Sequence, residues 1–569
     1  MNKVFSKFKL FIPIVLGLMV FGACSMYDLD INKDPNNPTT VNPKLLLSNA
    51  QIDCAQAFEG ANDDCHDFVG VTAGQGTDAF DLTNTSYNGL WSNFYSNGMK
   101  DLESILTITN GDAQQKNMRG VAQAMKAFYM GAFVDLFGSV PYSEAFKGDA
   151  AVSNTQAKFD TDKDIYANLI SLCDSAVANL AKTSFVPITN DIMYGNSIAK
   201  WTKFAKTTKL KLIFNSRRVR STSTAELTSI FATTADIIYG TTADNFSWNY
   251  TTTATPLDRR HPWHRIGYAG ANNEYSYFNQ EWIVDMVDYA DPRLYYFTFP
   301  QVDYALNPAD PTQRGAIPFA YTPYNQQVIK RLYTSKGVTV NDSINSFLSR
   351  LFVRVRGDLS GIPQDGQYRL TAGAYPADGL HWSKGPVQLG TDYSGAAGGG
   401  RTGRGAGVFP LLTGNQVKFW HVESVLANGV PGDARKLFEE AMRDNFKLIS
   451  DFSIAKGTTT TAMPQAAIDK YVTLFLTRYD AAATNEQKLN VVLKQARYAN
   501  YGNGMEMYNA FRRTGYPNDL TAPKTRIRQF PLRLPYSADE LSLNKNAPKG
   551  DAVIFDRDAI FWDVVKFKF

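Results

Sequence analysis

The sequence predicts a mainly α-helical fold in which paired helices flank a loop-rich middle segment. Apolar residues recur every three to four positions before residue 220 and again after residue 410, as they do on one face of an amphipathic helix. Between about 221 and 409 the chain is instead rich in aromatic residues, Gly and Pro, with one helical pattern near 276–290. These observations predict one domain, 44–569, whose helical-repeat scaffold (about 44–220 and 410–569) carries an irregular insert (about 221–409).

The first flank contains helical patterns at 117–137, 161–182 and 197–216. Thr161 and Asp164 have the spacing of a helix N-cap, with Asp in place of the usual Glu or Gln. The lysines of the third segment are expected to face water, which is the usual place of a charged stripe. The apolar spacing of that segment directs inward Trp201, Phe204, Ala205, Thr208 and Leu212.

The second flank contains four further helical patterns, at 414–427, 433–449, 464–479 and 485–500. The segment NGVPGDA at 428–434 interrupts the first two with a Gly-Pro turn. This break predicts a helical hairpin, because Gly and Pro are the strongest interruptions of a helix.

The first 24 residues have the pattern of a secretory signal. Three lysines (Lys3, Lys7 and Lys9) precede an apolar run from Leu10 to Phe21, which is too short to span a bilayer. The small pair Gly22-Ala23 and then Cys24 follow, and F-G-A-C resembles a bacterial lipobox. We therefore expect a signal peptide at 1–23, acylation of Cys24 by fatty acids such as palmitate, and a polar, Pro-rich tether at 24–43. The alternative is an ordinary signal in which Cys24 is coincidental.

The net charge bears on the kind of partner, and the cysteines bear on whether the chain contains a disulfide. With 58 basic and 54 acidic residues, the net charge of +4 is too balanced to indicate a nucleic-acid partner. Cys54 and Cys65 could form a disulfide in an exported chain, or could both be buried thiols; the sequence leaves the two readings open. Cys173 lies on an apolar helical stripe, which is typical of a core residue.

Motifs of catalysis and metal binding are missing from the sequence. No G-x-S-x-G, phosphate-binding loop or H-E-x-x-H occurs, and no cofactor is expected. His261 and His264 are flanked by arginines that would repel a metal ion, and further ligands would be needed. Asp28, Asp30, Asn32 and Asp34 resemble the start of a calcium loop but lack its later Gly and Glu. We therefore expect neither a metal site nor an enzyme.

Several segments resemble the SusD-like (SusD/RagB-type) outer-membrane lipoproteins of Bacteroidetes. The resemblance follows the family order from the tether to the end of the chain, with departures at Gln416 and His421. The matching segments are INKDPNNPTTVNPKLLL at 31–47, DLFGSVPY at 135–142, WTKFAKTTKLKL at 201–212, ADPRL at 290–294, GIP at 361–363, EMYNAFRRTGYP at 506–517, LRLPY at 532–536 and IFW at 560–562.

The resemblance implies a tetratricopeptide-like scaffold of helix pairs on the outside of the outer membrane. It also implies a non-catalytic protein that binds an oligosaccharide nutrient and delivers it to a SusC-like TonB-dependent transporter. Two alternatives stay open: binding of a peptide or another nutrient in the same role, and a glycoside hydrolase, which would need two carboxylates about 5–10 Å apart.

A sugar-binding site is expected in the insert, where aromatic and polar residues gather on loops. In the segment 258–282, stacking candidates are Trp263, Tyr268, Tyr275 and Tyr277, and polar candidates are Arg265, Asn272, Asn273 and Glu274. Secondary candidates are Asp78, Phe80 and Trp382. The alternative for each aromatic residue is a place in the core, and Trp91 is expected there because its neighbours are helical.

Overall fold

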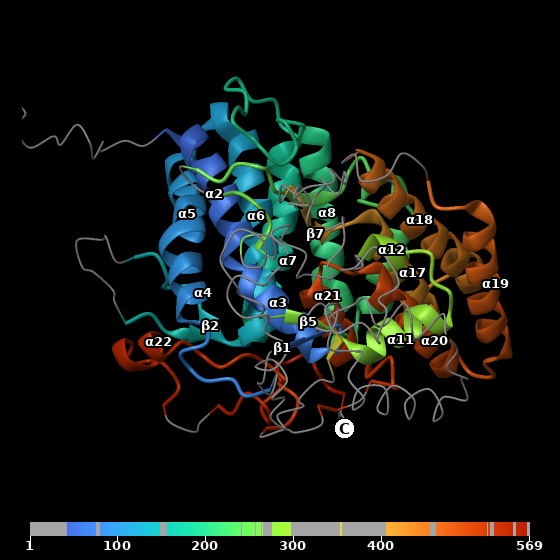
Figure 1. Ribbon diagram of the computed structural model, residues 1–569. Helices are drawn as coiled ribbons and strands as arrows, with labels where there is room; N and C mark the ends of the chain where they lie inside the picture. Colours follow the sequence, from blue (N-terminus) through green and yellow to red (C-terminus); the bar gives the residue numbers. More distant parts are fainter. Residues whose placement is uncertain are drawn as a thin grey trace, which may run out of the picture.

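Helices occupy both flanks of the chain in the computed structural model (Figure 1). The structure describes residues 42–74, 80–147, 156–240, 242–255, 258–262, 265, 276–297, 353–354, 406–455, 462–520, 522–523, 528–549 and 553–565. The expected signal peptide, Cys24 and most of the expected tether lie outside these residues, as does most of the middle segment. Within the described residues, no helix is both long enough and apolar enough to cross a bilayer.

The first flank consists of helices that pack side by side (Figure 1). Asn42 caps the first of them by accepting a hydrogen bond from the backbone N–H of Lys44. In chain order the helices are α2 (Pro43–Ala57), α3 (Glu59–Phe68), α4 (Asn88–Asn93), α5 (Met99–Ile108), α6 (Lys116–Phe137), α7 (Asp162–Leu180), α8 (Ile198–Asn215) and α9 (Ser223–Phe231). A π-helical turn, Phe94–Gly98, joins α4 to α5.

The second flank forms a second group of packed helices, which contacts α3 and α9 of the first group (Figure 1). The predicted hairpin is confirmed: α17 ends at Asn428, Gly429 adopts a left-handed conformation (φ 68°), and α18 follows. The helices are α17 (Gly414–Asn428), α18 (Ala434–Ala455), α19 (Gln465–Ala481), α20 (Asn485–Ala499), α21 (Gly504–Thr514) and α22 (Ala538–Leu543).

Short strands connect the first flank with the described part of the middle segment. β1 (Thr72–Gly74) pairs antiparallel with β5 (Ser276–Asn279), which also pairs parallel with β6 (Val353–Arg354). β4 (Phe246–Asn249) pairs antiparallel with β7 (Val408–Leu412). In the first flank, β2 (Val140–Pro141) pairs with β3 (Phe159–Asp160), and the middle segment also contains the helices α11 (Gln280–Asp288) and α12 (Leu294–Phe297). The helix expected near 276–290 is thus a strand followed by a helix.

The predicted mainly helical fold is confirmed, and the local signals largely gave the helix ends. Thr161 accepts a hydrogen bond from the backbone N–H of Asp164 at 3.1 Å, as the capping pattern predicts. The expected inward face of α8 is buried, and Trp91 lies in the core. Cys54, Cys65 and Cys173 are buried free thiols. Helix α6 differs from its expected single apolar face, because helices on several sides bury almost its whole surface.

One lysine of α8 does not face water. Lys211 is only 7% exposed, and its ammonium lies 2.7 Å from the carboxylate of Asp135 on α6. That buried carboxylate accepts hydrogen bonds from α7, α8, α21 and the C-terminal segment. The donors are Tyr166, Lys211, Asn215, Asn509 and Trp562. The expectation that all lysines of this helix face water is wrong for Lys211, because a buried counter-charge lies opposite it.

A second buried ion cluster surrounds Glu423 on α17. Its carboxylate accepts hydrogen bonds from Arg217 and, at 3.0 and 3.1 Å, from Arg513 on α21. Burial would raise the pKa of Glu423, but the charges of the two arginines outweigh it and the pKa lies below its usual value. Burial lowers the pKa of Arg217 to about 10. Glu423 and the two arginines therefore stabilise one another in their charged forms.

His421, a departure from the family pattern, is a buried neutral ring. It stacks on Phe231 with ring centroids 4.1 Å apart, and the Tyr239 hydroxyl lies 2.8 Å from its Nδ1. Burial lowers the pKa of His421 to about 4, with a smaller contribution from the charge of Lys418. An unfolded chain would take up this proton at higher pH than the folded chain.

We expect Glu423→Gln to lower the free energy of unfolding by about 3–5 kcal/mol, because it leaves buried guanidinium groups without their counter-charge. Urea unfolding measures this loss. The matched control is Glu439→Gln on α18, which removes a half-exposed ion pair with Arg443 and should cost about 0.3–0.5 kcal/mol. Equal losses in the two variants would contradict the central role of Glu423.

We expect His421 to make the folded state less stable as the pH falls from about 6.5 towards 4. In that window the unfolded chain binds a proton that the folded chain does not, so acid favours unfolding. At pH 5 this linkage amounts to about 2 kcal/mol. His421→Phe keeps a ring against Phe231 and removes the proton, so its unfolding free energy should change less between pH 7 and pH 5. Parallel pH curves for the two proteins would contradict this linkage.

Candidate ligand-binding site

The ribbon formed by β4 and β7 separates two cavities. Asn249 lies opposite Val408, and Trp248 lies opposite Phe409. Successive side chains of a strand point to opposite faces, so each strand contributes to both sides of the ribbon. Val408 and Pro410 line the larger cavity, whereas Phe409 between them lines the smaller one.

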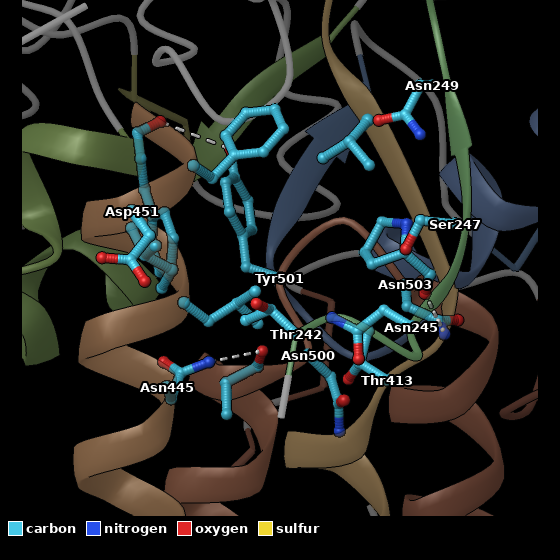
Figure 2. A pocket seen from close by; sticks show the side chains of 17 residues that line it. Thr242, Asn245, Ser247, Asn249, Thr413, Asn445, Asp451, Asn500, Tyr501 and Asn503 are labelled. Atoms are coloured by element: carbon cyan, nitrogen blue, oxygen red, sulfur yellow. Dashed lines mark hydrogen bonds between the residues drawn. The ribbon is translucent and has the colours of Figure 1, made fainter. Parts of the chain in front are cut away.

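The larger cavity, here called the amide cavity, has a volume of about 330 Å³. Its walls come from the ribbon, from α18 and from the turn between α20 and α21 (Figure 2). Its apolar lining consists of Phe297, Val408, Pro410, Leu448, Ile449, Phe452 and Ala499. Its polar lining consists of Thr242, Asn245, Ser247, Asn249, Thr413, Asn445, Asp451, Asn500, Tyr501 and Asn503.

Four polar residues of the amide cavity hold its walls together. Asn503 accepts from the backbone N–H of Glu506 at the start of α21 and donates to the carbonyl of Pro410 at 2.8 Å. Thr413 caps α17, and Asn245 accepts from the N–H of Gly414. Asn445 donates to the carbonyl of Ala499 and accepts from the buried guanidinium of Arg293. These groups fix the shape of the cavity.

Four other polar side chains of the cavity have no hydrogen-bond partner within the described part of the chain: Thr242, Ser247, Asn249 and Asn500. Asn249 is exposed and Asn500 is mostly buried. An amide side chain offers both donors and an acceptor, which matches a sugar hydroxyl group. In Figure 2, Ser247 and Asn249 lie on the ribbon side, Asp451 and Asn445 on the α18 side, and Tyr501 between them.

The smaller cavity, here called the Arg265 pocket, has a volume of about 200 Å³. Arg265 lies in its wall, ion-paired with Glu59 at the start of α3. The Tyr250 hydroxyl also donates to Glu59, at 2.9 Å. Burial raises the pKa of Glu59, although Arg265 and Tyr250 act against this rise. His261 lines the same pocket with its ring 4.8 Å from that of Tyr250.

A third hollow, of about 350 Å³, lies among α7, α8 and α9. Its charged side chains are already paired: Lys206 with Asp236, and Lys209 with Asp174. Glu226 is likewise bound by Arg220. This hollow therefore offers a ligand fewer unoccupied polar groups than the amide cavity does.

The structure describes three of the residues predicted to contact ligand. Arg265 lines its pocket, and Tyr277 lies on β5 opposite Ala73. Phe80 is fully buried, with its ring against Phe68 and Phe530, so it is a core residue here and does not face a ligand. The other candidates lie outside the described residues: Asp78, Trp263, Tyr268, Asn272, Asn273, Glu274, Tyr275 and Trp382. His264 of the proposed histidine pair also lies outside them.

The amide cavity was not among the sequence predictions. Two short segments carry its open amides: NFSWN at 245–249, where polar and aromatic residues alternate, and ANYGN at 499–503 between two helices. Each segment contains two asparagines next to an aromatic residue or one position removed from it, which was the available signal. Among the described residues, no group of three His, Cys, Asp or Glu side chains is arranged to hold a metal ion.

Comparison with known proteins gives two family-model matches. One model, described as starch-binding and associating with the outer membrane, matches residues 35–331. The other, described as SusD and RagB outer membrane lipoprotein, matches residues 408–555. No curated protein matches the chain in sequence.

Solved structures share the fold over almost the whole chain. A SusD-like protein of Bacteroidetes AC2a has a TM-score of 0.65 at 19% identity, covering 92% of this chain and 100% of its own. A chitin-binding protein has a TM-score of 0.63 at 21% identity, again covering 92% and 100%. A SusD/RagB family protein of Bacteroides thetaiotaomicron has a TM-score of 0.63 at 18% identity, covering 93% and 100%.

At these identities the solved structures establish the fold, which is the helical, tetratricopeptide-like fold of SusD-like proteins. The family models establish the relationship, since the first alone spans more than half of the chain and the second covers most of the remaining scaffold. The chain therefore belongs to the SusD-like family of outer-membrane lipoproteins.

Proposed function

We propose that this protein binds an oligosaccharide at the outer face of the outer membrane, without catalysis, and delivers it to a SusC-like TonB-dependent transporter. Membership of a family whose models are described as starch-binding and as outer-membrane lipoproteins supports this role. The fold it shares with a chitin-binding protein is consistent with a glycan ligand. The observation that carries the proposal is the amide cavity, in which open amide groups face an apolar wall.

The lining of the amide cavity suits the two surfaces of a sugar. A pyranose ring presents C–H groups on its faces and hydroxyl groups around its edge. The side chains of Phe452, Val408 and Pro410 provide apolar surface for the first, and the amides of Asn249 and Asn500 provide donors and acceptors for the second. Walls held by internal hydrogen bonds lose little freedom when a ligand binds, which favours affinity.

The charged groups of the cavity fit binding better than glycoside hydrolysis. A glycosidase needs two carboxylates on either side of the scissile bond. Among the described lining residues, Asp451 of α18 is the only carboxylate, and it is half-exposed and paired with Lys447. This composition supports a protein that holds its ligand and releases it unchanged.

Attachment to the membrane is proposed to depend on Cys24. Cleavage before this residue and its acylation would place two or more fatty-acid chains at the start of the mature protein, and each buried CH₂ contributes about 0.8 kcal/mol to membrane binding. The polar tether that follows would give the helical scaffold room to sit over a transporter. The experiments below use a mature form with Cys24→Ser, which should leave the membrane and stay in solution.

Calorimetry with oligosaccharide and peptide panels tests the proposed ligand class. We expect Asn249→Ala to weaken binding of the best oligosaccharide by about 0.5–1.5 kcal/mol, the net contribution of one hydrogen bond. Asn93→Ala is the control, because this exposed asparagine at the end of α4 lines none of the three cavities. Binding of peptides alone, or equal affinity of both variants and the parent, would contradict the proposed ligand or its site.

Trp263, which is close to Arg265 in the sequence, stays a proposed stacking residue. Loss of its ring in Trp263→Ala should weaken oligosaccharide binding by about 1–3 kcal/mol, by analogy with stacking of bases on aromatic residues. Trp91→Phe serves as the control for a tryptophan in the core, and should change stability more than affinity. Unchanged affinity in Trp263→Ala would remove the segment 258–282 from the binding site.

A further inference from the structure

The charges around the amide cavity are unevenly distributed. Among its described lining residues there is one ionised side chain, Asp451, and no Lys, Arg or His. Asp451 projects from α18 on the side opposite the ribbon (Figure 2). Lys447 is one turn earlier on the same helix, and its Nζ lies 2.6 Å from Oδ2 of Asp451. Lys447 does not line the cavity. A ligand therefore meets amides, hydroxyls and one carboxylate.

The arginine behind the cavity wall is already neutralised. Arg293 reaches the wall through Asn445, whose amide oxygen accepts from Nη1 at 2.9 Å. Its charge is matched by Asp291, and both side chains are almost completely buried. The guanidinium thus orients the amide of Asn445 and is shielded from a ligand by it.

The Arg265 pocket on the other face of the ribbon offers no excess of positive charge either. Its described lining includes Glu59 and Asp63 on α3 as well as Arg265. The Arg265 guanidinium is bound to the Glu59 carboxylate and also donates to the carbonyl of Asp258. An anionic group placed at either face of the ribbon would meet no unmatched cation among the described residues.

We propose that the amide cavity takes uncharged or amine-bearing sugar residues and discriminates against uronic acids and sulfated sugars. The inference rests on the proposed function and deepens it. An anionic group entering the cavity loses its water and gains no counter-charge, which is costly. A carboxylate or sulfate also only accepts hydrogen bonds, so the amide oxygens of Asn249 and Asn500 would stay unmatched, whereas a hydroxyl can donate to them.

Matched pairs of oligosaccharides that differ in charge test this selectivity with the mature Cys24→Ser chain. Suitable pairs are oligogalacturonate with its methyl ester, glucuronoxylan with xylan oligomers, and sulfated galactan oligomers of the carrageenan type with their desulfated, neutral form. An array of these pairs, with N-acetylated and deacetylated chito-oligosaccharides, is followed by calorimetry at physiological ionic strength. Within every neutral–anionic pair that binds, we expect the uncharged member to bind at least tenfold more tightly, whereas the deacetylated chito-oligosaccharide should show no such loss against its N-acetylated form. A ratio below tenfold would overturn the inference and leave the proposed function standing.

Charge reversal locates the selectivity in the cavity. We expect Asp451→Lys to reduce the neutral-to-anionic affinity ratio at least threefold, because it provides the missing cation at the wall. Glu439→Lys on the same helix makes the same change of charge outside the cavity and should leave the ratio unchanged. Equal effects of the two variants would overturn the assignment to the cavity. Absence of binding to any glycan on the array would overturn the proposed function itself, and this inference with it.

Discussion

A buried carboxylate, Asp135, connects parts of the chain that are far apart in sequence. Donors reach it from α7, α8, α21 and the C-terminal segment, which supplies Trp562. Arg512 of α21 also donates to the backbone carbonyl of Asp135, at 2.6 Å. Removing a charged group from water is costly, so the folded state must bring all of these donors to one point. The two helical flanks are consequently closed against each other.

Closure of the flanks determines where the cavities form. The ends of the middle segment, β4 and β7, pair beside the start of α21, and Asn503 connects them by capping the helix and donating to Pro410. Gly504 follows directly, and a side chain there would collide with the carbonyl of Asn62 on α3. The same turn therefore fixes α21 against α3 and forms one wall of the amide cavity.

Polar residues of the cavity divide into two groups with different roles. One group is hydrogen-bonded to backbone atoms, which makes the walls rigid; its members are Asn503, Asn245 and Thr413. Asn249 and Asn500 have no such partner within the described residues and can meet a ligand. A rigid frame with a few unoccupied groups is what a binding protein needs, since the frame costs little entropy on binding and the open groups give selectivity.

The sequence by itself determined the features that depend on neighbouring residues. Helix ends followed from Thr161 and Gly429, inward faces from the spacing around Trp201, and the family from motifs spread along the chain. Only the tertiary structure decided that Lys211 is buried, that Phe80 packs in the core and that Arg265 pairs with Glu59. It also brought Asn249 and Asn500 to one cavity. Local signals act within about one helical turn, whereas these placements depend on which faces of distant segments meet.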